Sequence, residues 1–186
     1  MSHLNYRAFH SLAFIVSFAC SVFAANSATA DTERFAIAIH GGAGTIDKEK
    51  LQGALKRQYE AKLRQALDTG YALLEKGSSS QEAVIAAIQI LEDSPLFNAG
   101  RGAVYTFEGT HELDASLMEG ATLQVGAVAG VKTVKSPIAL AKAVMDKSPH
   151  VLLFGDGAET FAAEQGIARV SNDYFDTEER YESLLR

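Results

Sequence analysis

Residues 103–131 decide the fold class, and they read AVYTFEGTHELDASLMEGATLQVGAVAGV. Apolar runs at 103–107, 112–118 and 123–131 are separated by short turns that contain glycine. This spacing predicts three strands joined as an antiparallel meander. Helical patterns precede and follow the three runs, so we predict an α+β fold and not a doubly wound parallel sheet.

The flanking sequence predicts mainly helices. Leucines recur at three- to four-residue steps from Lys48 to Lys76, and Gly77 is the predicted stop. A second helix begins at the capping box of Ser79 and Glu82 and ends before Pro95. The remaining predicted elements are short buried strands at 35–39 and 151–154, a helix at 136–146, a helix to about residue 165, and a helical segment from about residue 177.

The first thirty residues follow a different pattern. An apolar run at 12–25 suits the core of a signal peptide and is short for a membrane span. Small residues at 28–30 predict cleavage before Asp31. We therefore expect 1–30 to be a signal peptide, 31–186 to be the folded part, and the protein to be periplasmic or secreted, without membrane attachment once the signal is removed. The alternatives are an uncleaved anchor or lipidation of Cys20.

The composition excludes one class of function. Among 186 residues, 23 acidic side chains outnumber 17 basic ones, giving a formal net charge of −6. The sequence has no basic run, so it offers little to neutralise phosphates and nucleic-acid binding is not expected. The one cysteine lies in the signal segment, so the folded part has no disulfide framework.

Two glycine-rich segments are candidate site loops. The first, His40-Gly41-Gly42-Ala43-Gly44, follows the predicted strand at 35–39 and lets backbone amides approach a ligand, but it has neither the dinucleotide nor the P-loop spacing. The second, 96–104, places Asn98 beside glycines, and its amide can orient a reacting hydroxyl or hold a loop. The glycines would also let carbonyl oxygens point towards a hard cation. In both segments a purely structural turn is the alternative.

A third segment, 111–120, contains His, Glu, Asp and Ser. On a strand, His111 and Leu113 share one face, whereas Glu112 and Asp114 share the other. Neither face carries a Ser/His/Asp set, and a zinc site is not expected. We expect the two carboxylates to be buried and to accept hydrogen bonds from loop amides.

Taken together, HGGAG, PLFNAGRGAV, THELDASLMEG, GAVAGV, SPIALAKAVM and SPHVLLFGDGAE resemble, in this order, the plant-type L-asparaginase/isoaspartyl peptidase family of N-terminal-nucleophile hydrolases. The resemblance covers 35–186 and is most specific over 95–130. It implies that the chain forms part of an αββα four-layer sandwich. It also implies a precursor that cuts itself into α and β subunits, hydrolyses L-asparagine to aspartate and ammonia, and removes isoaspartyl residues from β-aspartyl peptides.

The family's nucleophile is a threonine freed at the start of the β subunit, and its own α-amine can take the hydroxyl proton. The resemblance places that threonine beyond Arg186, so we expect the chain to be the α portion, inactive by itself and without a catalytic residue. Thr45, Thr110 and Thr122 stand in other contexts and are not candidates. The implied partners are a β subunit from the same precursor, an (αβ)₂ assembly, and a small-molecule or peptide substrate.

The resemblance also assigns supporting residues. It implies that His40, Gly41 and Gly42 border the catalytic pocket and that Asn98 lies near the nucleophile. It implies no cofactor for catalysis, but a structural sodium ion held by the backbone carbonyls of Leu91, Glu92, Ser94, Phe97, Ala99 and Arg101. Two alternatives remain, namely a non-catalytic binding or regulatory module with the α fold, and the α half of a glycosylasparaginase-like enzyme. Substrate preference would depend on β-subunit residues.

Overall fold

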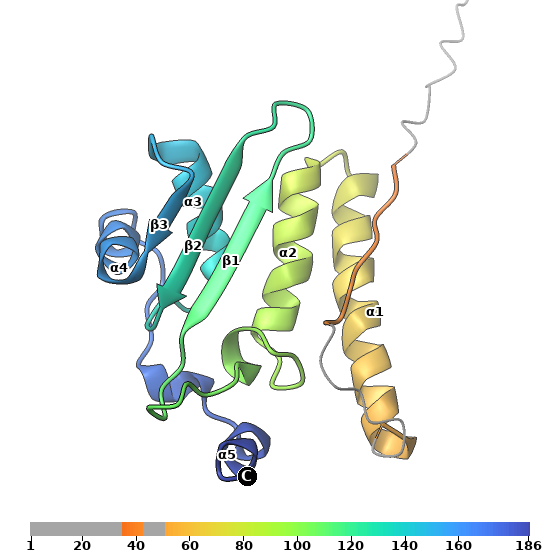
Figure 1. The fold of residues 1–186 in the computed structure, drawn as a ribbon. Helices are drawn as coiled ribbons and strands as arrows, with labels where there is room; N and C mark the ends of the chain where they lie inside the picture. Colours follow the sequence, from red (N-terminus) through yellow and green to blue (C-terminus); the bar gives the residue numbers. More distant parts are fainter. Residues whose placement is uncertain (1–34, 43–50) are drawn as a thin grey trace, which may run out of the picture. The chain divides into compact units, whose positions relative to one another are not determined.

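The computed structural model describes residues 35–42 and 51–186, so the predicted signal peptide and residues 43–45 lie outside the described residues. Within this part, none of the helices is long and apolar enough to cross a membrane. Figure 1 shows the elements, which in chain order are α1 (Gly53–Glu75), α2 (Ser80–Glu92), η1 (Gly100–Gly102), β1 (Leu113–Met118), β2 (Val125–Val131), α3 (Pro137–Lys147), β3 (Leu152–Phe154), α4 (Gly155–Glu164), η2 (Asn172–Phe175) and α5 (Glu178–Leu184).

Helices α1 and α2 form a hairpin whose turn follows the predicted signals. Gly77 has φ of 79°, and its amide donates to the Leu74 carbonyl at 2.9 Å, so it ends α1 as predicted. Ser79 and Glu82 form the predicted capping box at the start of α2. The helices approach closely at Gly70, where an added Cβ would lie 3.0 Å from the Ala83 carbonyl oxygen.

The sheet has the order β1-β2-β3. Strands β1 and β2 are antiparallel, as predicted, whereas β3 is parallel to β2 and is reached through α3. The predicted strand at 103–107 is wrong, because these residues form a loop that leads into a turn. The Val104 amide and carbonyl are bonded to the side chains of Asn98 and His111, so they are not available for a strand ladder. The predicted three-strand meander is therefore wrong as well.

The predicted strand at 35–39 is also wrong. This segment has no assigned strand and lies beside α1. The rings of Phe35 and Tyr71 are 5.2 Å apart, and Ile37 lies against Gly70. Its apolar side chains are thus partly covered by a helix, and no described strand pairs with its backbone.

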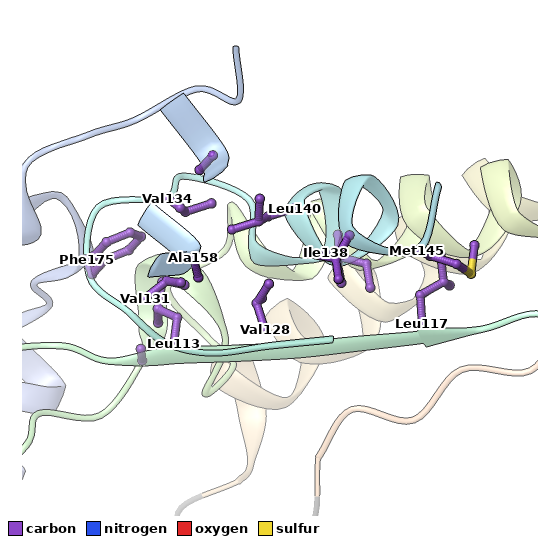
Figure 2. Packing of buried hydrophobic residues seen from close by; sticks show 14 residues of the cluster. Leu113, Leu117, Val128, Val131, Val134, Ile138, Leu140, Met145, Ala158 and Phe175 are labelled. Carbon is purple, nitrogen blue, oxygen red and sulfur yellow. The ribbon is translucent and has the colours of Figure 1, made fainter. Parts of the chain in front are cut away.

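One face of the sheet carries the core. Figure 2 shows the core side chains between the sheet and the helices, with Leu117 and Val128 facing Ile138 of α3. On the opposite face, Leu152 and Phe154 are 54% and 71% exposed. The described residues therefore form an α+β unit with helices on one face of the sheet. The αββα four-layer sandwich remains a prediction.

Candidate functional site

The two predicted site loops meet in the structure, although they are more than 50 residues apart in the sequence. A Cβ placed on Gly41 would lie 3.1 Å from Leu63 Cδ2 and 3.5 Å from Phe97 Cε1. Gly42 has φ of 109°, and its amide donates to His40 Nδ1 at 3.1 Å. The described part of the first loop, His40 to Gly42, therefore packs through glycine against the second loop.

The second loop, residues 94–104, is here called the Asn98 loop. Asn98 Oδ1 accepts the Val104 amide at 2.9 Å, so the amide side chain closes the loop. Two glycines are required by close backbone approach, because a Cβ on Gly100 would lie 2.3 Å from the Glu92 carbonyl oxygen and one on Gly102 would lie 2.1 Å from that of Phe97. The loop is thus a tightly built turn that presents Asn98.

Helix α1 holds the start of the Asn98 loop. The Tyr59 hydroxyl donates to the Leu96 carbonyl at 2.7 Å, and the Tyr59 and Phe97 rings meet edge to face at 5.4 Å. Partial burial raises the pKa of the Tyr59 phenol, so it remains a hydrogen-bond donor at neutral pH. The helix thereby fixes the loop on the side that faces Gly41.

The six residues predicted to hold a cation lie on or beside this loop, but their side chains have different roles. Glu92 is buried, and its carboxylate accepts from the Ser136 hydroxyl at 2.6 Å and the Ile138 amide at 2.9 Å. Burial raises the pKa of Glu92, and these two donors partly oppose the rise. The Glu92 side chain is therefore committed to the start of α3, whereas the backbone of Glu92 lies against Gly100.

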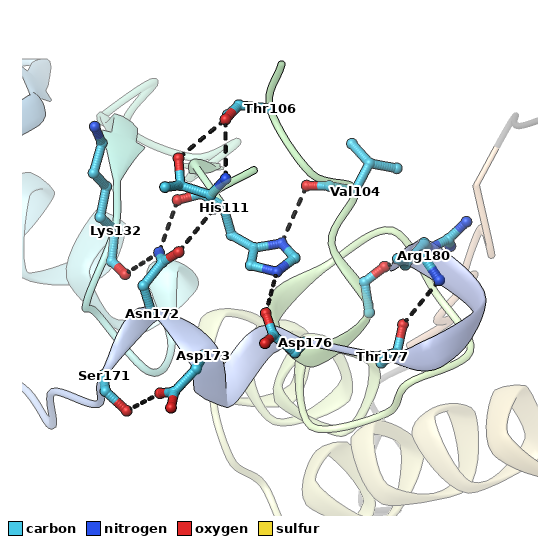
Figure 3. A network of polar contacts seen from close by, with 12 residues as sticks. Val104, Thr106, His111, Lys132, Ser171, Asn172, Asp173, Asp176, Thr177 and Arg180 are labelled. Atoms are coloured by element: carbon cyan, nitrogen blue, oxygen red, sulfur yellow. Dashed lines mark hydrogen bonds and ion pairs between the residues drawn. The ribbon is translucent and has the colours of Figure 1, made fainter. Parts of the chain in front are cut away.

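A buried histidine ties the far end of the Asn98 loop to η2 (Figure 3). The His111 ring is fully buried, with Nδ1 3.2 Å from the Val104 carbonyl oxygen and Nε2 3.0 Å from Asp176 Oδ1. The Asn172 side chain bonds both backbone groups of His111, accepting its amide at 2.9 Å and donating to its carbonyl at 3.0 Å. We refer to these contacts as the His111 network.

Helix α5 adds a further anchor. Arg180 Nε donates to the Gly102 carbonyl oxygen at 2.8 Å. Sequence reasoning missed Asn172, Asp176 and Arg180 because they lie 61 to 78 residues from their partners. The nearest sequence signal is Thr177, which caps α5 by accepting the Arg180 amide and so predicts where the helix begins, but not what it touches.

The strand β1 carboxylates differ in part from expectation. Glu112 and Asp114 do lie on the face opposite Leu113, but both are exposed, so their predicted burial is wrong. Asp114 Oδ1 accepts the Gly130 amide at 2.8 Å, as predicted for a structural carboxylate, whereas Glu112 pairs with Lys132 at 3.1 Å. These acids face solvent because α3 covers only the other face of the sheet.

The two described threonines that were considered as nucleophiles are bonded within local turns. Thr110 Oγ1 lies 3.0 Å from Thr106 Oγ1, and Thr122 donates to the Glu119 carboxylate. Both are therefore parts of turns that connect the elements of this unit.

A groove of about 400 Å³ lies away from the Asn98 loop, lined by Glu112, Gly130, Lys132, Thr133, Phe154, Gly155, Asp156, Glu159 and Arg169. Glu159 is its most strongly bonded group, because it accepts the Lys132 amide at 2.6 Å and both the amide, at 2.7 Å, and the hydroxyl of Thr133. Burial by itself raises the pKa of Glu159, but these donors and Arg169 together lower it below its ordinary value. The charged groups of the groove therefore pair with one another, Glu159 with Arg169 and Glu112 with Lys132.

Comparison with known proteins identifies similar sequences. A family model described as Asparaginase matches residues 33–186. The chain is 52% identical over 149 residues to an isoaspartyl peptidase of Salmonella typhimurium. The aligned region is 80% of this chain and 48% of that protein. It is 46% identical over 151 residues to a plant-type L-asparaginase of Pyrococcus furiosus, covering 81% of this chain and 48% of that protein. The chain spans about half the length of the curated relatives it matches.

Proposed function

This chain belongs to the asparaginase family, in the branch of isoaspartyl peptidases and plant-type L-asparaginases, and from that premise we propose that it is the N-terminal part of a self-cleaving amidohydrolase precursor. The precursor hydrolyses L-asparagine to aspartate and ammonia and removes isoaspartyl residues from β-aspartyl peptides. The relatives at 52% and 46% identity, which are named isoaspartyl peptidase and plant-type L-asparaginase, support both activities.

One structural observation carries the proposal: His40 to Gly42 and the Asn98 loop meet at Gly41 and Phe97. An amidase site needs a polar group that binds a hydroxyl or a developing negative charge, beside backbone that can approach the substrate closely. Asn98 supplies such a group. Its oxygen is bonded to Val104, so its nitrogen is the donor left for the nucleophile or the substrate.

The nucleophile in this proposal is the N-terminal threonine of a β subunit made from the same precursor. Cleavage frees its α-amine, which takes the hydroxyl proton as the hydroxyl attacks the side-chain amide or the isopeptide carbonyl. The described part of the chain supplies the wall of the pocket and Asn98, and it is inactive by itself.

The proposed β subunit covers the open face of the sheet. Leu152 and Phe154 are exposed there, and apolar side chains of this size on one sheet face support a partner layer at that position. An (αβ)₂ assembly and export by the 1–30 signal belong to the same proposal.

The proposal includes a structural sodium ion, held by the carbonyl oxygens of Leu91, Glu92, Ser94, Phe97, Ala99 and Arg101. Hard cations take oxygen ligands, and Gly100 and Gly102 allow close approach to the Glu92 and Phe97 carbonyls. These backbone oxygens are of the kind that a hard cation takes, and this chemistry is what supports the sodium proposal. A higher melting temperature in sodium chloride than in choline chloride at equal ionic strength would support it, and equal melting temperatures would contradict it.

The test uses the complete gene product. We expect the purified precursor to separate into two fragments on incubation, the second beginning with threonine by N-terminal sequencing, and to release ammonia from L-asparagine and leucine from β-aspartyl-leucine. The 186-residue chain, assayed in parallel, should release neither. A precursor that stays uncut and binds aspartate without turnover would instead indicate the non-catalytic binding module, and activity in the 186-residue chain would refute the assignment of the nucleophile.

A further inference from the structure

We propose that His111 and Asp176 are a positioning pair that fixes Asn98 for the reaction, a role that rests on the function proposed above. The pair touches no substrate in this proposal. It acts through Val104, whose backbone connects the His111 network to the Asn98 side chain.

The His111 ring is held at both of its nitrogens. Its two nitrogens face the Val104 carbonyl oxygen at 3.2 Å and a carboxylate oxygen of Asp176 at 3.0 Å. Both partners accept hydrogen bonds, and the ring donates to one or to both of them according to its tautomer. The fully buried ring therefore bridges the Val104 backbone and the Asp176 carboxylate.

The Val104 backbone connects His111 to Asn98. The Val104 carbonyl is held by His111, and the amide of the same residue donates to Asn98 Oδ1 at 2.9 Å. Val104 alone therefore connects the His111–Asp176 pair to Asn98. A shift of the Val104 backbone would remove the bond that orients the Asn98 amide and thereby turn its nitrogen away from the nucleophile.

Two tyrosines and an arginine surround the His111–Asp176 pair. The Tyr105 ring lies 4.1 Å from the His111 ring. Burial and Asp176 raise the pKa of Tyr105 to about 12, so this phenol stays neutral beside the pair. Tyr181 also faces Tyr105, and Arg180, from the same segment, holds the Gly102 carbonyl. Segment 172–180 therefore anchors Gly102 through Arg180, and Val104 through Asp176 and His111.

The experiment compares Asp176→Asn with Asp173→Asn in the complete precursor. Asp176 is 52% exposed, so removing its charge leaves the core packing intact. Asp173 is a matched control, because it is an exposed carboxylate in the same turn that accepts the Ser171 hydroxyl and has no described bond to His111. A third variant, His111→Phe, keeps an aromatic ring but removes both ring hydrogen bonds.

Two readouts separate positioning from general stability. Hydrogen exchange of peptides spanning 98–106, measured at one pH, should be about tenfold faster in Asp176→Asn and unchanged in Asp173→Asn, the effect expected for losing a charge-assisted bond. The kcat for ammonia release should fall about tenfold in Asp176→Asn while KM changes less than twofold, because Asn98 acts on the reacting groups. His111→Phe should change both readouts in the same direction.

Equal hydrogen-exchange rates of peptides 98–106 in Asp176→Asn and Asp173→Asn would refute the role of the His111–Asp176 pair, whatever kcat is measured. Faster exchange with unchanged kcat would reduce the pair to a structural contact and overturn the positioning role. A wild-type precursor that releases no ammonia would overturn the proposed function and the catalytic part of this proposal, whereas the exchange comparison would still decide whether His111 and Asp176 fix the loop.

Discussion

Substituting Glu159 by glutamine should destabilise the fold at neutral pH but not in acid. The Glu159 side chain is only 13% exposed. Its carboxylate accepts hydrogen bonds from two backbone amides, at 2.6 and 2.7 Å, and from the Thr133 hydroxyl, and it forms an ion pair with Arg169 at 3.5 Å. Glutamine keeps one oxygen for the two amides but loses the charge and presents an amide group to Thr133 and Arg169. Hydrogen bonds to charged groups contribute about 1.5–3 kcal/mol each, so we expect a net loss of about 2 kcal/mol.

The pH dependence follows from the direction of the pKa shift. The donors lower the pKa of Glu159 below its ordinary value of 4.5, so near that pH the folded state holds fewer protons than the unfolded chain. The stabilisation from Glu159 is therefore present above about pH 4.5 and is lost as the pH falls through the lower folded pKa. The difference between wild type and Glu159→Gln should shrink towards zero over the same range.

Urea unfolding followed by circular dichroism, at pH 7.5 and pH 4, measures this difference. With a slope of about 2 kcal/mol per molar urea, the midpoint at pH 7.5 should fall by about 1 M. Glu112→Gln is the control in the same groove, because its 47% exposed side chain makes a surface ion pair with Lys132 that contributes about 0–1 kcal/mol. Equal losses in the two variants, or a loss for Glu159→Gln that stays constant with pH, would refute the reasoning.

Three further predictions concern the core, the base of the Asn98 loop and the open sheet face. Gly126→Ala should cost about 3 kcal/mol in urea unfolding, because its Cβ would lie 2.1 Å from the Ala141 carbonyl oxygen, whereas Gly120→Ala, which meets no atom within 4 Å, should be close to neutral. Because burial raises the pKa of Glu92, wild type should lose stability as the pH rises above about 4.5, and Glu92→Gln should gain stability relative to it over that range in thermal melts. The 186-residue chain should self-associate in light scattering, and Leu152→Thr should reduce the association; a monomeric wild-type chain would contradict this.

Signals that act within one or two turns predicted the helices well. The capping box of Ser79 and the stop at Gly77 are local hydrogen-bond patterns, so the sequence around them is sufficient. The predicted strand at 103–107 failed because an apolar run does not reveal that the Val104 amide and carbonyl bond to side chains. The segment at 35–39 failed because its pairing depends on tertiary structure and not on its own residues.

In the candidate site, too, local features were predicted from the sequence and long-range contacts were not. Glycine content predicted tight loops at His40 to Gly42 and around Asn98, and both are present in the described residues. Their meeting at Phe97 depends on how α1 packs and could not be read from either segment. The anchors Asp176 and Arg180 were missed because no local pattern connects residues 65 and 78 positions apart.

The long sequence separation of these anchors has a consequence for the order of folding during synthesis. A ribosome adds about 5–20 residues per second, so Asn172, Asp176 and Arg180 follow the Asn98 loop by several seconds. The α1–α2 hairpin, the β1–β2 pair and α3 all leave the ribosome before these anchors. A nascent chain that has not yet reached residue 176 can therefore hold most of its core while His111, which holds the Val104 carbonyl, lacks Asp176. We therefore expect the anchoring of Val104 to follow the formation of most of the core.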